Sequence, residues 1–216
     1  MAEFTLYGYF RSSASHRVRI AMNLKNLKYD YKPVHLINNG GEQHNQEYKK
    51  LNPSEQVPTL VHNGKALGQS MAIVQYLDEV APEHRLLPTD PFEKAKVIQF
   101  CEIINSGIQP LHNLAVTDEL GRLGLDEKAR GEWITVAISK GLNALEAFLK
   151  ETAGTYCFGG SLSAADAFLV PQVFSAKRFN TSTDNYPTVM RVFENCCKLD
   201  AFKAAEPLNQ PDAPKS

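Results

Sequence analysis

Three serines lie beside two nitrogen-bearing side chains in the stretch Ser12-Ser13-Ala14-Ser15-His16-Arg17. The apolar run over residues 4–9 predicts a strand before it, and the spacing of Val18, Ala21 and Met22 predicts a helix after it. The serines therefore fall at a strand-to-helix turn, where unpaired backbone N–H groups and the helix dipole favour a negative charge. A serine hydroxyl adds one more donor to an anion. The pattern predicts an anion site, and the alternative is that one serine only caps the helix.

Two further motifs belong to the same part of the chain. Gln69-Ser70 begins a second predicted helix, whose N-terminus can bind a carboxylate, although an ordinary N-cap is the alternative. Val57-Pro58 begins a predicted strand. Because most X–Pro bonds are trans, the sequence favours a trans bond there. The first 70 residues thus contain two predicted helix N-termini and a predicted strand with a proline at its start.

The elements that must position these motifs alternate between strand and helix. In order, they are a strand at 4–9, the first helix, a strand at 28–36, a turn at 38–41, a short helix at 43–50, a strand at 57–62, a hairpin return at 65–68 and the helix from Gln69. Pro33 indicates an edge position for the second strand. A strand-helix-strand unit implies parallel pairing, and Asn63-Gly64 predicts an antiparallel hairpin. This is the layout of a thioredoxin-like domain.

Residues 81–91 contain three prolines and predict a linker. The rest is predicted to be helical, over about 91–114, over 126–149, from a capping box at Ser163–Asp166 onward, and over 187–199. Pro171 should kink the third of these helices or delay its start. The tail from Glu206 is predicted to be extended. The expected domains are 1–82 and 91–216, with the linker at 83–90.

Composition narrows the class of protein. The 216 residues contain 23 Lys plus Arg and 24 Asp plus Glu, and a net charge of −1 argues against nucleic acid as the partner. No apolar run is long enough for a membrane span, and no secretory signal is visible, so we expect no membrane partner. The four cysteines form no Cys-x-x-Cys pair and predict reduced thiols in the cytoplasm. The six histidines show no metal spacing, and no metal is predicted.

Several of these motifs together resemble the glutathione transferases over essentially the whole chain, and most of all the zeta class, that of the maleylacetoacetate isomerases. The motifs are Ser12-Ser13-x-x-His16-Arg17-Val18-Arg19-Ile20-Ala21, Asn52-Pro53-x-x-Gln56-Val57-Pro58-Thr59-Leu60, Gln69-Ser70-x-Ala72-Ile73-x-x-Tyr76-Leu77, Ile108-Gln109-Pro110-Leu111-x-Asn113-Leu114 and the box Ser163–Asp166. The resemblance implies an α/β thioredoxin-like domain followed by an all-helical domain. One position departs from it, because Ala14 stands where the class has a cysteine.

The resemblance implies an enzyme with glutathione as coenzyme. The thiolate of glutathione would add to the cis double bond of maleylacetoacetate, and rotation and elimination would give fumarylacetoacetate, a step of tyrosine and phenylalanine breakdown. It also implies a cytoplasmic homodimer. Two alternatives are conjugation or dehalogenation of α-halo acids on the same thiolate and a non-catalytic docking module, and the retained motifs argue against the second.

The resemblance also assigns the site. Ser12 would activate the thiol, with Ser13 as the runner-up. Glutathione would be bound by Ser12, Ser13, Ala14, Ser15, His16, Arg17, Gln43, Val57, Pro58, Gln69, Ser70, Gln109, Asn113, Leu114 and Ala115. Cations for an anionic diketo acid would be Arg11, His16 and Arg178, each with a solvated surface charge as the alternative. For Arg17 and Arg19 the alternative is a buried ion pair. A free thiol has a pKa of about 8.5, and lowering it by two units requires about 2.7 kcal/mol, a plausible total for a hydroxyl and a helix end.

Overall fold

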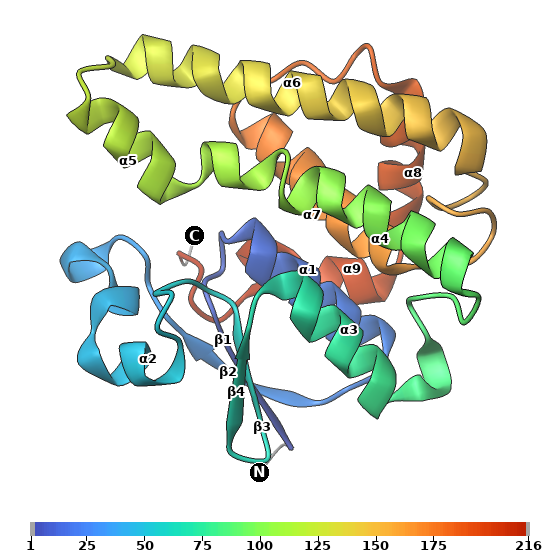
Figure 1. Ribbon diagram of the computed structural model, residues 1–216, viewed down its shortest axis with the longest axis horizontal. Helices are drawn as coiled ribbons and strands as arrows, with labels where there is room; N and C mark the ends of the chain where they lie inside the picture. Colours follow the sequence, from blue (N-terminus) through green and yellow to red (C-terminus); the bar gives the residue numbers. More distant parts are fainter. Residues whose placement is uncertain (1–2, 215–216) are drawn as a thin grey trace. The chain divides into compact units, whose positions relative to one another are not determined.

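The computed structural model describes residues 3–214, which form two compact units (Figure 1). The first contains the chain up to Leu86 together with the segment from Leu199, and the second is Leu87–Lys198. The sequence assigned everything after residue 91 to the helical domain. The structure differs at the end of the chain, because the last helix packs on the first unit.

A mixed sheet of four strands forms the centre of the first unit, in the order β2-β1-β3-β4. The strands are β1 (Phe4–Gly8), β2 (Tyr29–Pro33), β3 (Thr59–His62) and β4 (Lys65–Gly68). β1 pairs parallel with β2 and antiparallel with β3, and β3 forms a hairpin with β4. The predicted thioredoxin-like layout is confirmed, and Pro33 lies on an edge strand as expected.

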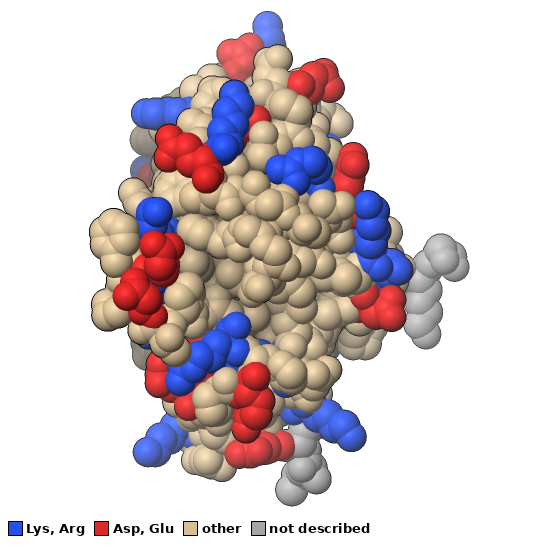
Figure 2. All heavy atoms as spheres, turned by 90° about the vertical axis from the view of Figure 1, so that its right-hand side faces the viewer, with Lys and Arg blue, Asp and Glu red and all other residues tan. Residues whose placement is uncertain are grey.

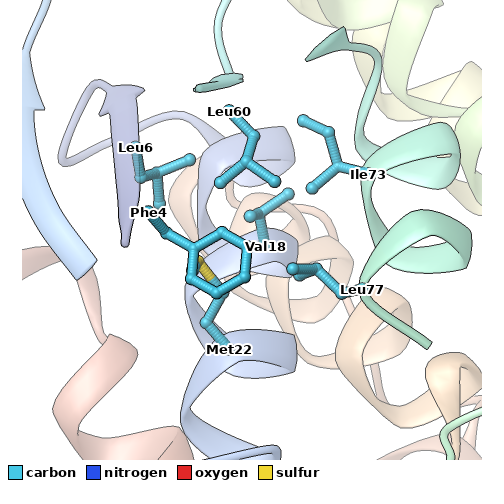
Figure 3. Packing of buried hydrophobic residues seen from close by; sticks show 7 residues of the cluster. All are labelled: Phe4, Leu6, Val18, Met22, Leu60, Ile73 and Leu77. Atoms are coloured by element: carbon cyan, nitrogen blue, oxygen red, sulfur yellow. The ribbon is translucent and has the colours of Figure 1, made fainter. Parts of the chain in front are cut away.

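Helices α1 (Ser13–Leu24) and α3 (Ser70–Val80) supply the other half of this core. Figure 3 shows side chains of β1, β3, α1 and α3 converging in one cluster. Its members are Phe4, Leu6, Val18, Met22, Leu60, Ile73 and Leu77. Alternate residues of β1 are buried, as a half-covered strand requires. The packing fixes both helices on the sheet, and therefore fixes where their N-termini lie.

The smaller elements of this unit are η1 (Asn38–Gly40), η2 (Glu42–His44), α2 (Gln46–Leu51), η3 (Pro82–His84), α9 (Asp200–Ala205) and η5 (Pro207–Asn209). The prediction of an extended tail was wrong, because η5 and a turn follow α9. The carbonyl group of Ala205 accepts a hydrogen bond from buried Arg19 in α1, which holds α9 beside that helix.

The second unit is helical. Its elements are α4 (Pro91–Asn105), η4 (Gln109–His112), α5 (Leu114–Arg122), α6 (Glu127–Thr152), α7 (Ala164–Arg178) and α8 (Pro187–Cys197). The helix predicted to reach about Leu114 ends at Asn105, and Gly107 and Pro110 follow in the break. The sequence missed α5. The capping box of α7 is confirmed, with both backbone and side chain of Ser163 donating to Asp166, and Pro171 does not delay the start of the helix.

The four thiols are free, and burial raises the pKa of the Cys157 and Cys196 thiols. Among the described helices, none combines the length and apolar character that crossing a membrane requires. No group of residues able to hold a metal ion occurs within residues 3–214. Figure 2 shows basic and acidic side chains interspersed on one face, in keeping with the net charge of −1.

Two glycines of α6 differ in what a methyl group would meet. At exposed Gly131 an added Cβ has nothing within 4 Å, whereas at Gly141 it would overlap Cγ1 and Cδ1 of buried Ile108. Ile108 directly precedes η4. The close approach of the Ile108 side chain to the Gly141 backbone therefore fixes the position of η4 on α6.

We expect opposite effects from the same substitution at these two positions. Gly131→Ala should stabilise the protein by about 0.5–1 kcal/mol, because alanine favours a helix. Gly141→Ala should destabilise it by about 1–3 kcal/mol, because the methyl overpacks Ile108. Denaturant unfolding measures both, and equal effects would contradict close packing at Gly141.

Candidate functional site

The first helix N-terminus lies at the end of β1. The Ser12 backbone N–H donates to the Tyr9 carbonyl at 3.0 Å and closes a turn. Ser12 is the extended N-cap of α1, and its Oγ accepts from the Ser15 N–H at 3.2 Å. The capping alternative is therefore real, but the cap uses only the oxygen. The hydroxyl proton of Ser12 remains able to donate to an anion.

The other two serines differ in exposure. Ser13 is half-buried in the first turn of α1, whereas Ser15 is fully buried and its Oγ accepts from the Tyr9 N–H at 3.4 Å. Ser15 also lies against β1, since a Cβ on Gly8 would be 3.2 Å from the Ser15 hydroxyl oxygen. Ser15 thus packs the helix on the strand, and Ser12 and Ser13 remain for a ligand.

Arg19 is fully buried one turn further along α1. Its guanidinium donates to the carbonyl oxygens of Ala205 and Phe10, both at 3.0 Å, and of Tyr9 at 3.4 Å. Burial lowers the pKa of Arg19, and Tyr31, among other groups, opposes that shift. These contacts support a buried structural role for Arg19, in which carbonyl groups accept its hydrogen bonds in place of the expected ion-pair partner.

His16 does not supply the cation that the sequence analysis expected for an anionic substrate. Its side chain is 1% exposed, and burial, followed by the charge of Arg19, holds the pKa of His16 well below 6.5. The ring is therefore neutral at physiological pH. Arg11 is exposed, with its guanidinium carbon 5.9 Å from the centroid of the Tyr9 ring, and keeps its charge available.

The second helix N-terminus is joined to the first. Arg17 is buried, and its Nη1 donates to the Ser70 Oγ at 3.1 Å. Gln69 is the N-cap of α3, and its backbone has φ 68° and ψ 115°, a conformation that residues other than glycine rarely adopt. Such outliers cluster at ligand sites. The exposed Gln69 amide donates to the Gln56 Oε1 at 3.3 Å, which places it beside the loop before Val57.

The Val57–Pro58 bond is cis, so the expectation of a trans bond was wrong. Proline lowers the trans preference enough for the surrounding fold to decide. Gln43 lies buried in η2, with its Nε2 3.0 Å from the His44 Nε2. Its Oε1 is buried and has no hydrogen-bond partner within the described part of the chain. No hydrogen bond among residues 3–214 joins Gln43 to Ser12 or Ser13.

The remaining predicted site residues belong to the second unit. Gln109 lies in η4, and Asn113 caps α5 by accepting from the Ala115 N–H at 3.4 Å, with Leu114 and Ala115 exposed. Arg178 is the last residue of α7 and is exposed, with its guanidinium carbon 4.7 Å from the centroid of the Phe179 ring. Within this unit, the structure groups four of the five residues at the junction of η4 and α5.

The sequence analysis missed two residues beside the serine turn. The Asp212 Oδ2 accepts from the Phe10 N–H at 2.8 Å and from the Tyr31 hydroxyl at 3.4 Å. Tyr31 is half-buried, and burial raises the pKa of its hydroxyl. No local pattern identifies this pair, because 181 positions separate its members in the chain.

Family comparison agrees with this geometry. The glutathione S-transferase N-terminal domain matches residues 2–79, and the glutathione S-transferase C-terminal domain matches residues 124–204. The chain belongs to the glutathione S-transferase family.

Its relatives confirm the resemblance to the zeta class. The chain is 49% identical to the probable maleylacetoacetate isomerase 2 of Drosophila melanogaster over 209 residues, 97% of this chain and 90% of that protein. The structure of a bacterial maleylpyruvate isomerase of the zeta class matches with a TM-score of 0.93 and 39% identity, over 97% of this chain and all of that one. The maleylacetoacetate isomerase of Methylobacterium extorquens, solved with bound malonate and glutathione, matches with a TM-score of 0.92 and 35% identity over 98% of this chain and 100% of that chain.

We expect acid to destabilise the protein through His16. Unfolded His16 takes up a proton below its ordinary pKa of 6.5, whereas buried His16 stays neutral. Its contribution is therefore full above that value and is lost as the pH falls towards the depressed folded-state pKa, by at most about 1.4 kcal/mol per pH unit. Denaturant unfolding between about pH 7 and about pH 5 measures the slope.

The control for this slope is an exposed histidine. His16→Gln should flatten the pH dependence of the unfolding free energy, whereas His84→Gln should leave it as in the parent. A parent-like slope in His16→Gln would show that His16 does not remain neutral on folding.

Proposed function

We propose that this chain is a glutathione-dependent cis–trans isomerase that converts maleylacetoacetate to fumarylacetoacetate. The observation that supports it most is the N-terminus of α1, where half-buried Ser12 both caps the helix and keeps a hydroxyl proton for an anion. The names of the relatives agree with this activity. They do not support the α-halo acid alternative.

The chain's own groups fit glutathione. The strained backbone of Gln69 and the first N–H groups of α3 suit the γ-glutamyl carboxylate. The buried Gln43 Oε1 lacks a partner in the described residues and suits a donor such as the glycyl amide. Val57, which precedes the cis bond, would pair with the cysteinyl backbone. From the second unit, we assign Gln109 and Asn113–Ala115 to the same ligand.

When bound, glutathione supplies the thiolate that adds reversibly to the cis double bond and so permits rotation. The role of the protein is to keep the sulfur of glutathione ionised. Ser12 donates a hydrogen bond to the charged form, and the N-terminus of α1 adds its dipole. Neutral His16 adds no charge there, and Arg17 keeps the two helix ends together.

The substrate is a dianionic diketo acid and requires cations. We assign Arg11 and Arg178 to its carboxylates, since both are exposed and a guanidinium can hold a carboxylate with two parallel hydrogen bonds. The Methylobacterium extorquens relative was solved with malonate, a small dicarboxylate, beside glutathione. Because Ala14 has no thiol, the sulfur of glutathione is the nucleophile in this proposal.

We also infer a symmetric homodimer that acts in the cytoplasm in tyrosine breakdown. Large apolar side chains of the helical unit support association, because Phe92 is 69% exposed and Val136 is 66% exposed. The docking-module alternative has no support from the relatives, which are named as enzymes.

Ser12→Ala should raise the pKa of the bound glutathione thiol by about one unit, because the hydroxyl stabilises only the thiolate. It should also cost about 1 kcal/mol of folding stability through loss of the cap. Glutathione affinity should change little. The ultraviolet absorbance of the thiolate against pH measures the titration midpoint.

Two variants separate the donor from the cap. Ser12→Thr keeps a hydroxyl and a capping oxygen and should retain the parent midpoint, and Ser13→Ala should leave both midpoint and stability nearly unchanged. An unchanged midpoint in Ser12→Ala would exclude Ser12 as the activator and favour Ser13 or the backbone alone.

Arg178→Gln should weaken binding of maleylacetoacetate by about 1.5–3 kcal/mol, the range for hydrogen bonds to charged groups. Binding of glutathione and turnover of a neutral electrophile should be nearly unaffected. Lys177→Gln removes the neighbouring cation from the same helical turn and serves as the control. The measurement is kcat/KM for the acid and for the neutral electrophile, and equal losses for the two would show that Arg178 is structural.

A further inference from the structure

The turn that precedes Ser12 is held by hydrogen bonds to the backbone groups of Tyr9 and Phe10. The Tyr9 carbonyl accepts from Ser12 N–H and from Arg19, and the Phe10 carbonyl also accepts from Arg19. The Phe10 N–H has a different partner, the Oδ2 of Asp212, at 2.8 Å. This hydrogen bond joins residues that lie 202 positions apart in the chain.

Asp212 suits this position by charge as well as by geometry. Its carboxylate acts electrostatically on Arg19, which is fully buried and hydrogen-bonds to carbonyl groups and to Tyr31. The Tyr31 hydroxyl donates to the same carboxylate oxygen from the neighbouring strand β2. Two anchors precede Asp212 in the chain and keep the segment folded. They are the Ala205 carbonyl, which accepts from Arg19, and the Gln210 amide, which donates to the carbonyl groups of Ala204 and Glu206.

We propose that Asp212 is a positioning residue for the Ser12 hydroxyl, and that the chain's C-terminal segment thereby completes the glutathione site. Asp212 orients the Phe10 peptide, the Tyr9–Ser12 turn follows it, and the turn sets the direction of the hydroxyl. This inference rests on the proposed role of Ser12. It assigns a function to a segment that contributes no predicted ligand group.

Asp212→Ala removes the acceptor, and the full-length enzyme is the system for the test. In the protein without glutathione, amide exchange of the Phe10 N–H should become about tenfold faster, because its hydrogen bond is lost. In the complex with glutathione, the thiol pKa should rise by about 0.5–1 unit. The kcat near neutral pH should fall about three- to tenfold and should recover at high pH, where the thiol ionises without help.

Asp200→Asn is the matched control, because that fully exposed carboxylate lies in the same segment and pairs with exposed Lys203. It should leave exchange, thiol pKa and kcat unchanged. A purely structural role for Asp212 would lower the thermal unfolding temperature and lower kcat equally at all pH values, and that outcome would overturn the proposal.

The double variant Ser12→Ala/Asp212→Ala identifies which hypothesis fails. If Asp212 acts through Ser12, the thiol pKa of the double variant equals that of Ser12→Ala alone. Additive shifts would refute the inference and leave the proposed function intact, whereas no shift in Ser12→Ala would refute the role of Ser12 itself. If Asp212→Ala does not fold, Tyr31→Phe leaves Asp212 in place and removes the hydroxyl that donates to its carboxylate, a hydroxyl that also hydrogen-bonds Arg19. It should shift the thiol pKa in the same direction, and no shift would overturn the proposal.

Discussion

A buried guanidinium is the constraint on which the first unit depends. Arg19 is fully buried in α1, and an ion in that position costs several kcal/mol unless its donors are satisfied. The acceptors come from the turn after β1 and from the end of α9. Satisfying one side chain therefore joins the turn after β1, helix α1 and helix α9, although α9 lies far from the other two in the sequence.

The same logic links the two helix N-termini. Each of them presents unpaired N–H groups that favour an anion, and neither is supported by an acidic partner in its own first turn. Buried Arg17 joins them through Ser70, and the backbone of Gln69 is held in a conformation that costs about 1–3 kcal/mol. The sheet core beneath supplies the rigidity that maintains this strain, because both helices pack through it. The placement of the two helix N-termini thus depends on the apolar core as well as on the Arg17–Ser70 hydrogen bond.

Burial determines which side chains near the N-terminus of α1 carry a charge. Arg11 and His16 stand five positions apart, yet one remains an exposed cation and the other is neutral, because burial and the charge of Arg19 both disfavour its protonation. Burial separates the serines in the same way. Ser15 is buried and packs against β1, whereas Ser12 and Ser13 are half-buried and remain accessible to a ligand. At the N-terminus of α1, the groups that favour an anion are therefore the helix dipole and the Ser12 hydroxyl, without a charge on His16.

The sequence alone determined what depends on near neighbours: the alternating strands, the Asn63-Gly64 hairpin, the capping box at Ser163, and the serine cap that begins α1. These signals are local, because turn, cap and period involve residues within a few positions of one another. Only the tertiary structure decided the cis bond at Val57–Pro58, the neutral His16 and the return of the C-terminal segment to Phe10. Each of these depends on atoms distant in the chain, and burial and pairing between distant segments exist only once the chain has folded.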